Sequence, residues 1–487
     1  MNARAAALAT LLGLDAASLP EVTGLAFDSR AVQPGDVFFA LSGSKTDGAL
    51  YAVRAAEAGA ALVIGEGARP DGLPAGVAYA RVADARLALA KAAALVFPRQ
   101  PGCIVAVTGT AGKSSVADFA RQIFQSLGHS AASLGTLGVV SAKGAEYGSL
   151  TTPDPIALHR TLDRLAGAGV THLAVEASSH GLDQRRLDGI RLSAGAYTNL
   201  GRDHLDYHPT MDAYLACKLR LFSELLPDGA PAVINMDGER AGEVVAACRA
   251  RGLRVFTTGA RGEHLRLLSV ENRDFGQDLD IAYGKHVHRV HLPLIGAFQV
   301  ENALVAAGLA LALGAGARPV FEALGRLAGV PGRLERVGAK GNAPVFVDYA
   351  HKPDALEAVL STLRPSVAGR LIVAFGCGGD RDTGKRPIMG AIATRLADVT
   401  IVTDDNPRSE DPAAIRREIL MAAPGAIEIG DRGAAIRAGV AMLAEGDALV
   451  IAGKGHETGQ TIGSETTPFS DHEAARAALA AAGGTLS

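Results

Sequence analysis

The sequence predicts an α/β protein with three domains: a small α/β domain, a central mainly parallel sheet of phosphate-loop type wound with helices, and a doubly wound domain at the C-terminus. Three observations support this prediction. A chain of 487 residues is too long for one hydrophobic core. Apolar strand-like segments alternate with helical ones. Many of these strands end in glycine or polar residues. We place the domains at residues 1–99, 100–332 and 333–487.

The composition narrows the class of function. A formal charge of −3 gives no general attraction to nucleic acid or to an anionic membrane. The four cysteines show no CxxC spacing, which argues against a zinc site and a disulfide framework. No segment has the pattern of a signal peptide or of a membrane span of about 20 apolar residues. We therefore expect a cytoplasmic protein.

The N-terminal domain has one candidate ligand loop. The turn Pro34–Asp36 precedes an apolar strand, Val37–Leu41, and residues 42–48 follow as a polar loop containing two glycines. Loops at strand ends often bind ligands in α/β folds. An ordinary turn explains the same residues equally well. Pro98 and Pro101 mark the linker to the next domain.

The central domain begins with the clearest motif of the chain. The strand Ile104–Val107 enters a glycine-rich turn, and a helical pattern follows from Ser114 to Leu127. Backbone N–H groups of such a turn bind phosphate oxygens, Lys113 adds a positive charge, and the Ser114 hydroxyl suits Mg²⁺. Val107 stands where the full Walker motif has glycine, so the loop is a shortened one. The alternative is a simple glycine turn with a solvated lysine.

Further polar groups follow the next central strands. The strand Val170–Val175 ends at Glu176, which is well placed to reach Mg²⁺, and the strand Ala194–Leu200 precedes a loop rich in histidine and aspartate. Lys218 lies in a helical pattern from Asp212 to Leu225, where its spacing alone indicates a surface lysine. Residues 265–293 have a strand pattern, and a helix is expected from about residue 296 to 313.

The C-terminal domain has four strands that each deliver glycine or polar residues at their C-terminal ends. Helical segments lie between them, and Pro353-Asp354 is expected to cap the first. This pattern predicts a doubly wound domain with a site at one edge of its sheet. The strands begin at Val345, Leu371, Val399 and Ala448.

Together these motifs resemble the Mur ligase family, the ATP-dependent amide-bond ligases of peptidoglycan precursor synthesis, over essentially the whole chain. Ala111 and Gln299 depart from the family pattern, which has asparagine at both positions. The motifs that carry the resemblance are Thr108–Ser114, Glu176–Leu182, Thr198–His208, Asp348–His351, Gly376–Arg381, Asp405–Arg408 and Gly453–Glu457.

The resemblance implies a reaction and its participants. ATP would activate the carboxylate of UDP-N-acetylmuramoyl-L-alanyl-D-glutamate as an acyl phosphate, and the amine of meso-diaminopimelate would displace the phosphate. Mg²⁺, with two ions expected, would neutralise the phosphates. The family's carbamylated lysine matches Lys218, which overrides its interpretation as a surface residue. Neither nucleic acid nor membrane insertion is implied, and we expect a monomer.

The resemblance also assigns residues to each ligand. The catalytic set is Lys113, Glu176, His204 and Lys218. Metal ligands would be Ser114, Glu176, His204 and the carbamate of Lys218. ATP would contact Gly109, Thr110, Ala111, Gly112, Lys113, Ser114, Ser115, Asn302, Arg333 and Asp348. The UDP substrate would contact Phe27, Ser29, Ser44, Lys45, Thr46, Thr151, Thr152, Ser178, Gln184 and Arg186. Diaminopimelate would contact Arg381, Asp405, Asn406, Pro407, Arg408, Gly453 and Glu457.

Two other functions use a similar phosphate loop. One is a regulatory protein that uses ATP only as a switch, and the other is a folylpolyglutamate synthetase. The N-terminal domain argues against the folate enzyme. The motifs Asp405–Arg408 and Gly453–Glu457 argue against both.

Overall fold

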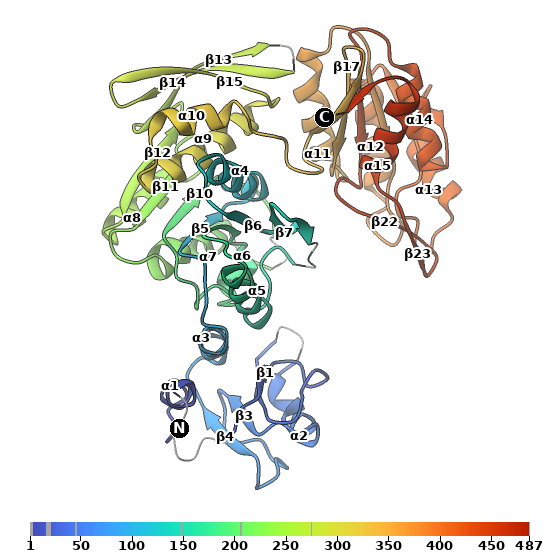
Figure 1. Ribbon diagram of the computed structural model, residues 1–487. Helices are drawn as coiled ribbons and strands as arrows, with labels where there is room; N and C mark the ends of the chain where they lie inside the picture. The colour runs from blue at the N-terminus through green and yellow to red at the C-terminus, as the bar shows by residue number, and fades with distance from the viewer. Residues whose placement is uncertain are drawn as a thin grey trace. The chain divides into compact units, whose positions relative to one another are not determined.

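The computed structural model describes residues 3–15, 21–43, 46–146, 148, 150–204, 207–273 and 275–486. The chain divides into two compact units. The first contains Met1–Arg266 and Leu304–Val320, and the second contains Leu267–Ala303 and Phe321–Ser487. Both are α/β structures, and each is described separately below (Figure 1).

The first unit begins with a small parallel sheet in the order β1-β2-β3-β4. Alternate residues of β2 face opposite sides: Val37 and Phe39 pack with α1 and α3, whereas Phe38 packs with α2. Every side chain of β2 is buried, which explains the apolar run from Val37 to Phe39. The elements are α1 (Ala3–Leu12), β1 (Gly24–Ala26), β2 (Asp36–Phe39), η1 (Gly48–Tyr51), α2 (Ala52–Glu57), β3 (Leu62–Gly65), β4 (Ala78–Arg81) and α3 (Ala85–Val96).

The larger sheet of this unit has the order β12-β11-β10-β5-β9-β6-β7-β8 and is parallel from β12 to β6. The phosphate-loop strand β5 therefore lies between β10 and β9. Its elements are β5 (Cys103–Thr108), α4 (Lys113–Ser126), β6 (Ala131–Gly135), β7 (Gly138–Ser141), β8 (Gly144–Glu146), α5 (Pro155–Gly167), β9 (His172–Glu176), α6 (Ser179–Asp183), β10 (Ala194–Tyr197), α7 (Met211–Arg220), the π-helix η2 (Leu221–Leu225), β11 (Pro231–Asn235), α8 (Ala241–Ala250) and β12 (Arg254–Gly259).

The strands expected over residues 265–293 are present as β13 (Leu265–Arg273), β14 (Gly276–Tyr283) and β15 (His286–Leu292). β14 and β15 form an antiparallel pair. The expected helix follows as α9 (Ala297–Ala312), and α10 (Ala317–Leu324) comes next.

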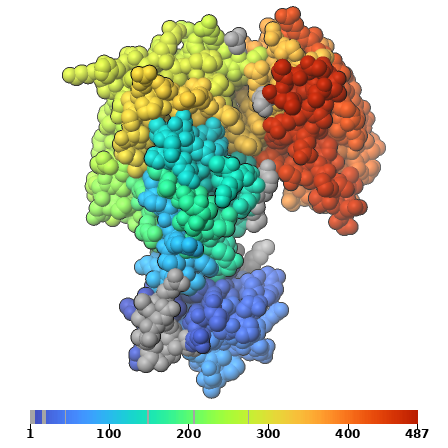
Figure 2. Space-filling view, in the orientation of Figure 1, coloured from blue at the N-terminus to red at the C-terminus, as the bar shows by residue number. Residues whose placement is uncertain are grey.

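The sheet of the second unit has the order β20-β19-β18-β21-β17-β16-β24. The four predicted strands are all parallel neighbours in it. On β18, Val373 and Phe375 face the core of α11 and α12, whereas Ile372 and Ala374 face that of α14 and α15. Helices therefore cover both faces, and the doubly wound prediction is confirmed. In Figure 2 the last part of the chain, coloured red, lies on the visible face of this unit.

The elements of this sheet and its helices are β16 (Glu335–Lys340), β17 (Ala343–Asp348), α11 (Pro353–Leu363), η3 (Arg364–Ser366), β18 (Leu371–Phe375), α12 (Lys385–Leu396), β19 (Val399–Val402), α13 (Pro412–Leu420), β20 (Ile427–Glu428), α14 (Arg432–Met442), β21 (Ala448–Ala452), the hairpin β22 (Gly459–Ile462) and β23 (Glu465–Pro468), α15 (Asp471–Ala481) and β24 (Thr485–Leu486). The capping prediction is wrong in one respect. Lys352 is the N-cap residue of α11 and makes no side-chain cap, and Pro353 begins the helix, where its missing N–H costs nothing.

All four cysteines are free thiols. Across the described ranges, every helix falls short of the length and apolar character that a bilayer span requires.

Candidate functional site

The turn between β5 and α4 has the backbone of a phosphate-binding loop. Gly109 and Gly112 have φ angles of 149° and 83°, which favour glycine. A Cβ atom on Gly109 would lie 1.9 Å from the Thr198 hydroxyl oxygen, so this position also lacks space for a side chain. The loop leads directly into the N-terminus of α4, where free N–H groups and the helix dipole attract anions.

The segment that follows β10 holds this loop in place. The Asn199 side chain accepts a hydrogen bond from the Ala111 amide at 2.9 Å, and the Thr198 hydroxyl donates to the Ala111 carbonyl at 2.6 Å. Ala111 thus makes these hydrogen bonds through its backbone N–H and carbonyl groups, while its side chain is exposed. The departure from asparagine at this position therefore removes none of these loop contacts. Sequence reasoning did not single out Asn199, although it lies within a recognised motif.

Two lysines meet at this loop. Lys113 Nζ donates to the carbonyl oxygens of Gly109 and Thr110, at 2.9 and 2.8 Å. Lys218 Nζ, on α7, also donates to Gly109 O, at 2.8 Å, and lies 4.1 Å from the centre of the Tyr214 ring. Lys218 is only 1% exposed, so its interpretation as a surface residue is wrong. Burial, followed by repulsion from Lys113, lowers the pKa of Lys218 to about 6.

Glu176 lies at the end of β9, beside the phosphate-loop strand, with Val107 as its partner in the neighbouring strand. The amide and hydroxyl of Thr136 donate to its two carboxylate oxygens at 2.8 and 3.2 Å. A Cβ on Gly135 would lie 1.9 Å from Glu176 Oε1, so glycine there makes room for the carboxylate. Each carboxylate oxygen keeps further acceptor capacity, which suits a cation ligand.

His204 is held in the left-handed region, with φ 53°, and its half-exposed ring lies 4.9 Å from that of His180. No group of three or more His, Cys, Asp or Glu side chains that could hold a metal occurs among the residues that the structure describes. The buried Glu176 carboxylate and the Ser114 hydroxyl are oxygen donors of the kind Mg²⁺ prefers. The chemistry of these two oxygen donors therefore fits Mg²⁺.

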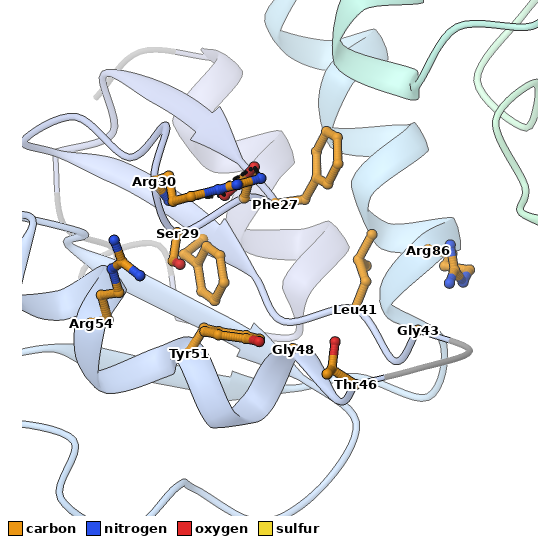
Figure 3. Close-up of a pocket in the computed structure, with 12 residues that line it drawn as sticks. Phe27, Ser29, Arg30, Leu41, Gly43, Thr46, Gly48, Tyr51, Arg54 and Arg86 are labelled. Carbon is orange, nitrogen blue, oxygen red and sulfur yellow. Dashed lines mark hydrogen bonds and ion pairs between the residues drawn. The ribbon is translucent and has the colours of Figure 1, made fainter. Parts of the chain in front are cut away.

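The N-terminal sheet carries a pocket of about 610 Å³ (Figure 3). Of the predicted residues, Phe27, Ser29 and Thr46 line it. Ser44 and Lys45 lie outside the described residues. Sequence reasoning missed the basic and aromatic side chains that complete the lining, because nothing local marks them: Arg30, Tyr51, Arg54 and Arg86.

A second hollow, of about 150 Å³, shares Phe27 and Arg86 with this pocket and adds the predicted residues Gln184 and Arg186. Arg186 donates to the Thr152 carbonyl at 2.6 Å and to the Gln184 side chain at 2.7 Å. A hydrogen-bond network thus leads from this hollow towards the phosphate loop.

Three more of the predicted residues join this network. The Thr152 hydroxyl donates to the Glu176 carbonyl at 2.7 Å and lies 3.0 Å from Ser178 Oγ. Thr151 lies 3.1 Å from the hydroxyl of Thr136, which holds Glu176. The structure therefore brings the predicted substrate residues of the central domain together around Glu176.

The remaining predicted nucleotide residues belong to the second unit. Asp348 accepts hydrogen bonds from the amides of Leu334 and Ala350, at 2.6 and 2.7 Å, while burial raises its pKa to about 6. The Arg333 guanidinium lies 5.2 Å from the centre of the Tyr349 ring. Asn302 is buried on α9. Gln299, the other departure from the family pattern, is buried with its amide nitrogen 3.5 Å from the Arg333 carbonyl.

The C-terminal ends of the parallel strands in the second unit enclose a pocket of about 520 Å³. It contains six of the seven residues predicted to bind the amino acid: Arg381, Asp405, Asn406, Arg408, Gly453 and Glu457. Pro407, the seventh, is buried and is absent from the lining. Tyr349, His351 and Lys385 also line the pocket and were missed.

The polar groups of this pocket are fixed in position. Glu457 Oε2 accepts from Asn406 Nδ2 at 2.9 Å and pairs with the buried Lys454 at 3.1 Å. Arg408 has a φ angle of 52° and donates to the Gly379 carbonyl at 2.7 Å. The lining holds two arginines, two lysines and four carboxylates, and such a lining suits a ligand bearing both carboxylates and amines.

Three family models match the chain: "Mur ligase family, catalytic domain" over residues 21–96, "Mur ligase middle domain" over 107–310, and "Mur ligase, glutamate ligase domain" over 332–455. A UDP-N-acetylmuramoyl-L-alanyl-D-glutamate–2,6-diaminopimelate ligase of Bradyrhizobium diazoefficiens is 60% identical, over 97% of this chain and 99% of that relative.

Solved structures give a similar result. A structure named for the same ligase has 34% identity and a TM-score of 0.70, covering 94% of this chain and 95% of its own. The folylpolyglutamate synthase of Mycobacterium tuberculosis, complexed with ADP and AMPPCP, has 20% identity and a TM-score of 0.59, covering 76% and 92%. The second likeness concerns the fold alone.

Proposed function

Because this chain belongs to the Mur ligase family, we propose that it is the ATP-dependent ligase that adds meso-2,6-diaminopimelate to UDP-N-acetylmuramoyl-L-alanyl-D-glutamate in peptidoglycan precursor synthesis. The pocket of the second unit is the observation that carries this proposal. Arg381 and Arg408 suit the two carboxylates of diaminopimelate, and Asp405 and Glu457 suit its amines.

The first step transfers the γ-phosphoryl group of ATP to the substrate carboxylate. The carboxylate oxygen attacks phosphorus, the bond to the bridging oxygen breaks, and ADP leaves. Such a step needs positioning and charge neutralisation more than covalent help from the protein. The glycines of the phosphate loop offer backbone N–H groups, and Lys113 supplies a positive charge. Asn302, Arg333 and Asp348 are assigned to the rest of the nucleotide.

Mg²⁺ would neutralise charge on the phosphates when bound. Ser114, Glu176 and His204 are the residues we assign to it, with Lys218 as a carbamate for a second ion. Carbamylation requires a neutral amine, and the lowered pKa of Lys218 provides one near pH 7. The carbamate forms when the lysine nitrogen attacks CO₂ and releases a proton.

The second step forms the amide bond. An amine of diaminopimelate attacks the acyl carbon, a tetrahedral intermediate forms, and inorganic phosphate leaves. The distal end of the amino acid is assigned to Arg408, Gly453 and Glu457, and its other carboxylate to Arg381. The UDP end is assigned to the pocket of the N-terminal sheet, where Arg54 and Arg86 add positive charge for a diphosphate.

The remaining assignments belong to the same proposal. The ligase has three functional domains, at residues 1–99, 100–332 and 333–487. It works as a monomer in the cytoplasm, where ATP and UDP-sugars are available. Neither a folylpolyglutamate synthetase nor an ATP-driven switch explains why the second unit carries a pocket that combines two arginines and two lysines with four carboxylates.

Phosphate release in the presence of ATP, Mg²⁺ and the UDP-dipeptide substrate tests this function. We expect release that depends on meso-diaminopimelate and yields the UDP-tripeptide by mass spectrometry. Release without any amino acid would indicate a switch. Release that depends on a folate and glutamate would indicate the folate enzyme.

A further inference from the structure

Behind the amino-acid pocket lies a buried ion pair that does not line it. Arg432 begins α14 and Asp471 begins α15, and their side chains are 1% and 0% exposed. Arg432 Nε and Nη2 donate to the two oxygens of Asp471, each at 2.7 Å, which is a bidentate geometry. Neither residue belongs to a motif singled out in the sequence.

The remaining N–H groups of Arg432 reach the two loops that carry the pocket's specificity residues. Nη2 donates to the Ala452 carbonyl at 3.0 Å, just before the loop that begins at Gly453. Nη1 donates to the Asp404 carbonyl at 3.4 Å and lies 4.0 Å from Asp405 Oδ2. One guanidinium thus links the ends of β19 and β21.

Close packing completes this arrangement. Gly453 has a φ angle of 120°, and a Cβ there would lie 2.5 Å from Asp405 Oδ2 and 3.7 Å from Arg432 Nη2. The carboxylate of Asp405 is therefore pressed against the backbone of the opposite loop. Burial raises the pKa of Asp405, the charges of Arg432 and Lys454 oppose that rise, and those of Glu457 and Asp471 add to it.

Stability alone is a weak reason for such a pair. Burying an arginine and an aspartate costs desolvation that their attraction roughly offsets, and apolar residues of the same volume often stabilise a core as well or better. Apolar residues cannot supply the fixed hydrogen-bond geometry of the pair. Through that geometry Arg432 contacts the two loops at one edge of the sheet.

We propose that Arg432 and Asp471 form a positioning pair that fixes the Asp405–Arg408 and Gly453–Glu457 loops relative to each other and thereby sets affinity and selectivity for the amino acid. The proposal rests on the proposed function. It makes no claim that either residue touches the substrate.

The test uses the chain of 487 residues with two variants: Asp471→Asn, which keeps the shape, and the double variant Arg432→Met/Asp471→Leu, which removes both charges. The rate of phosphate release is measured as a function of the concentration of meso-diaminopimelate or of L-lysine, with ATP and the UDP substrate at saturating concentrations. We expect the KM for diaminopimelate to rise about tenfold to a hundredfold and the preference over lysine to shrink. The KM for the UDP substrate should stay unchanged, and thermal unfolding should remain cooperative.

The chain offers a control ion pair at the opposite edge of the same sheet. Arg370, just before β18, pairs with the buried Asp447, just before β21, at 2.7 Å. Asp447→Asn should lower the melting temperature and leave the KM for diaminopimelate unchanged.

Three results would overturn the inference. One is an unchanged KM and selectivity in the folded Asp471→Asn variant. Another is an equal change in Asp447→Asn. The third is loss of the folded state in Asp471→Asn, which would make the pair a requirement of the whole sheet. If the unmodified protein released no phosphate in response to diaminopimelate, the proposed function would be refuted. The inference, which depends on that function, would then be refuted as well.

Discussion

Lys113 and Lys218 donate to the same acceptor, the carbonyl oxygen of Gly109, at 2.9 and 2.8 Å. Lys113 belongs to the phosphate loop and Lys218 to α7, so the shared oxygen joins two elements that are remote in sequence. Two ammonium groups this close disfavour each other's charge, and Lys218, which is the buried one, has its pKa lowered to about 6. The arrangement leads to three predictions.

Lys218→Ala should nearly abolish turnover, because the oxygen-bearing group proposed for the second metal would be missing. Short-chain carboxylates such as acetate should partly restore phosphate release by entering the space that the side chain leaves. Lys143→Ala, which changes an exposed lysine of the β7–β8 turn, is the control and should behave as the unmodified protein. Full activity of Lys218→Ala at low bicarbonate would contradict the carbamate assignment.

Lys113→Ala should lower ADP formation by roughly 10²- to 10³-fold or more, since a preorganised charge at the phosphates disappears. Binding of the UDP substrate should persist, because its proposed pocket is lined by residues between Phe27 and Arg86, all of which precede the phosphate loop. Calorimetry with the UDP substrate and an ADP-release assay measure the two effects separately. Loss of UDP-substrate binding with intact ATP chemistry would show that the domain assignment is wrong.

The pH dependence of carbamylation follows from the pKa of Lys218. The unfolded chain holds a proton on this lysine up to about pH 10.5, and the folded protein only up to about 6. Between these values the unfolded state binds more protons, so folding stability rises with pH through this window. The neutral amine is already the main form above pH 6.

At constant dissolved CO₂ the rate of activation of CO₂-depleted protein should therefore rise with pH and level off above about 6. Recovery of phosphate release over time measures this rate, and ¹³C NMR with labelled CO₂ identifies the carbamate. A rate that still increased tenfold per pH unit above pH 8 would point to an ordinary lysine.

The fold followed from patterns that are local in the sequence. The apolar runs that ended in polar residues, such as Leu371–Phe375 and Ala448–Ala452, are parallel strands buried on both faces. Their C-terminal ends meet at one sheet edge, so motifs far apart in the chain gather in one pocket. This is why six of the seven residues predicted to bind the amino acid line one pocket.

Other features depend on tertiary packing and left no local signal. The burial of Lys218 comes from packing of α7 against the phosphate loop, and helical spacing alone indicates the opposite. Arg54 and Arg86 lie on different helices and converge only in the folded N-terminal sheet. Arg432 and Asp471 are 39 residues apart, and each looks like an ordinary charged residue at a helix start.

The last prediction concerns the choice of amino acid. meso-Diaminopimelate differs from lysine by a carboxylate at its far end, and Arg408 lines the pocket where we place that carboxylate. Lysine would leave this guanidinium desolvated without its partner, at a cost of roughly 2–5 kcal/mol. Since ~1.4 kcal/mol is a factor of ten, kcat/KM should favour diaminopimelate by about 30-fold to several thousand-fold.

Arg408→Ala should remove most of this preference, by lowering kcat/KM for diaminopimelate while changing that for lysine little. Arg395→Ala is the matched control, because Arg395 is a largely exposed arginine of α12 that pairs with Glu357 and is absent from the pocket lining. Competition between the two amino acids in one assay, with both UDP-tripeptides quantified by mass spectrometry, gives the ratio directly. Comparable kcat/KM values for L-lysine and meso-diaminopimelate in the unmodified protein would refute the assignment of Arg408, since the desolvated guanidinium would then cost nothing.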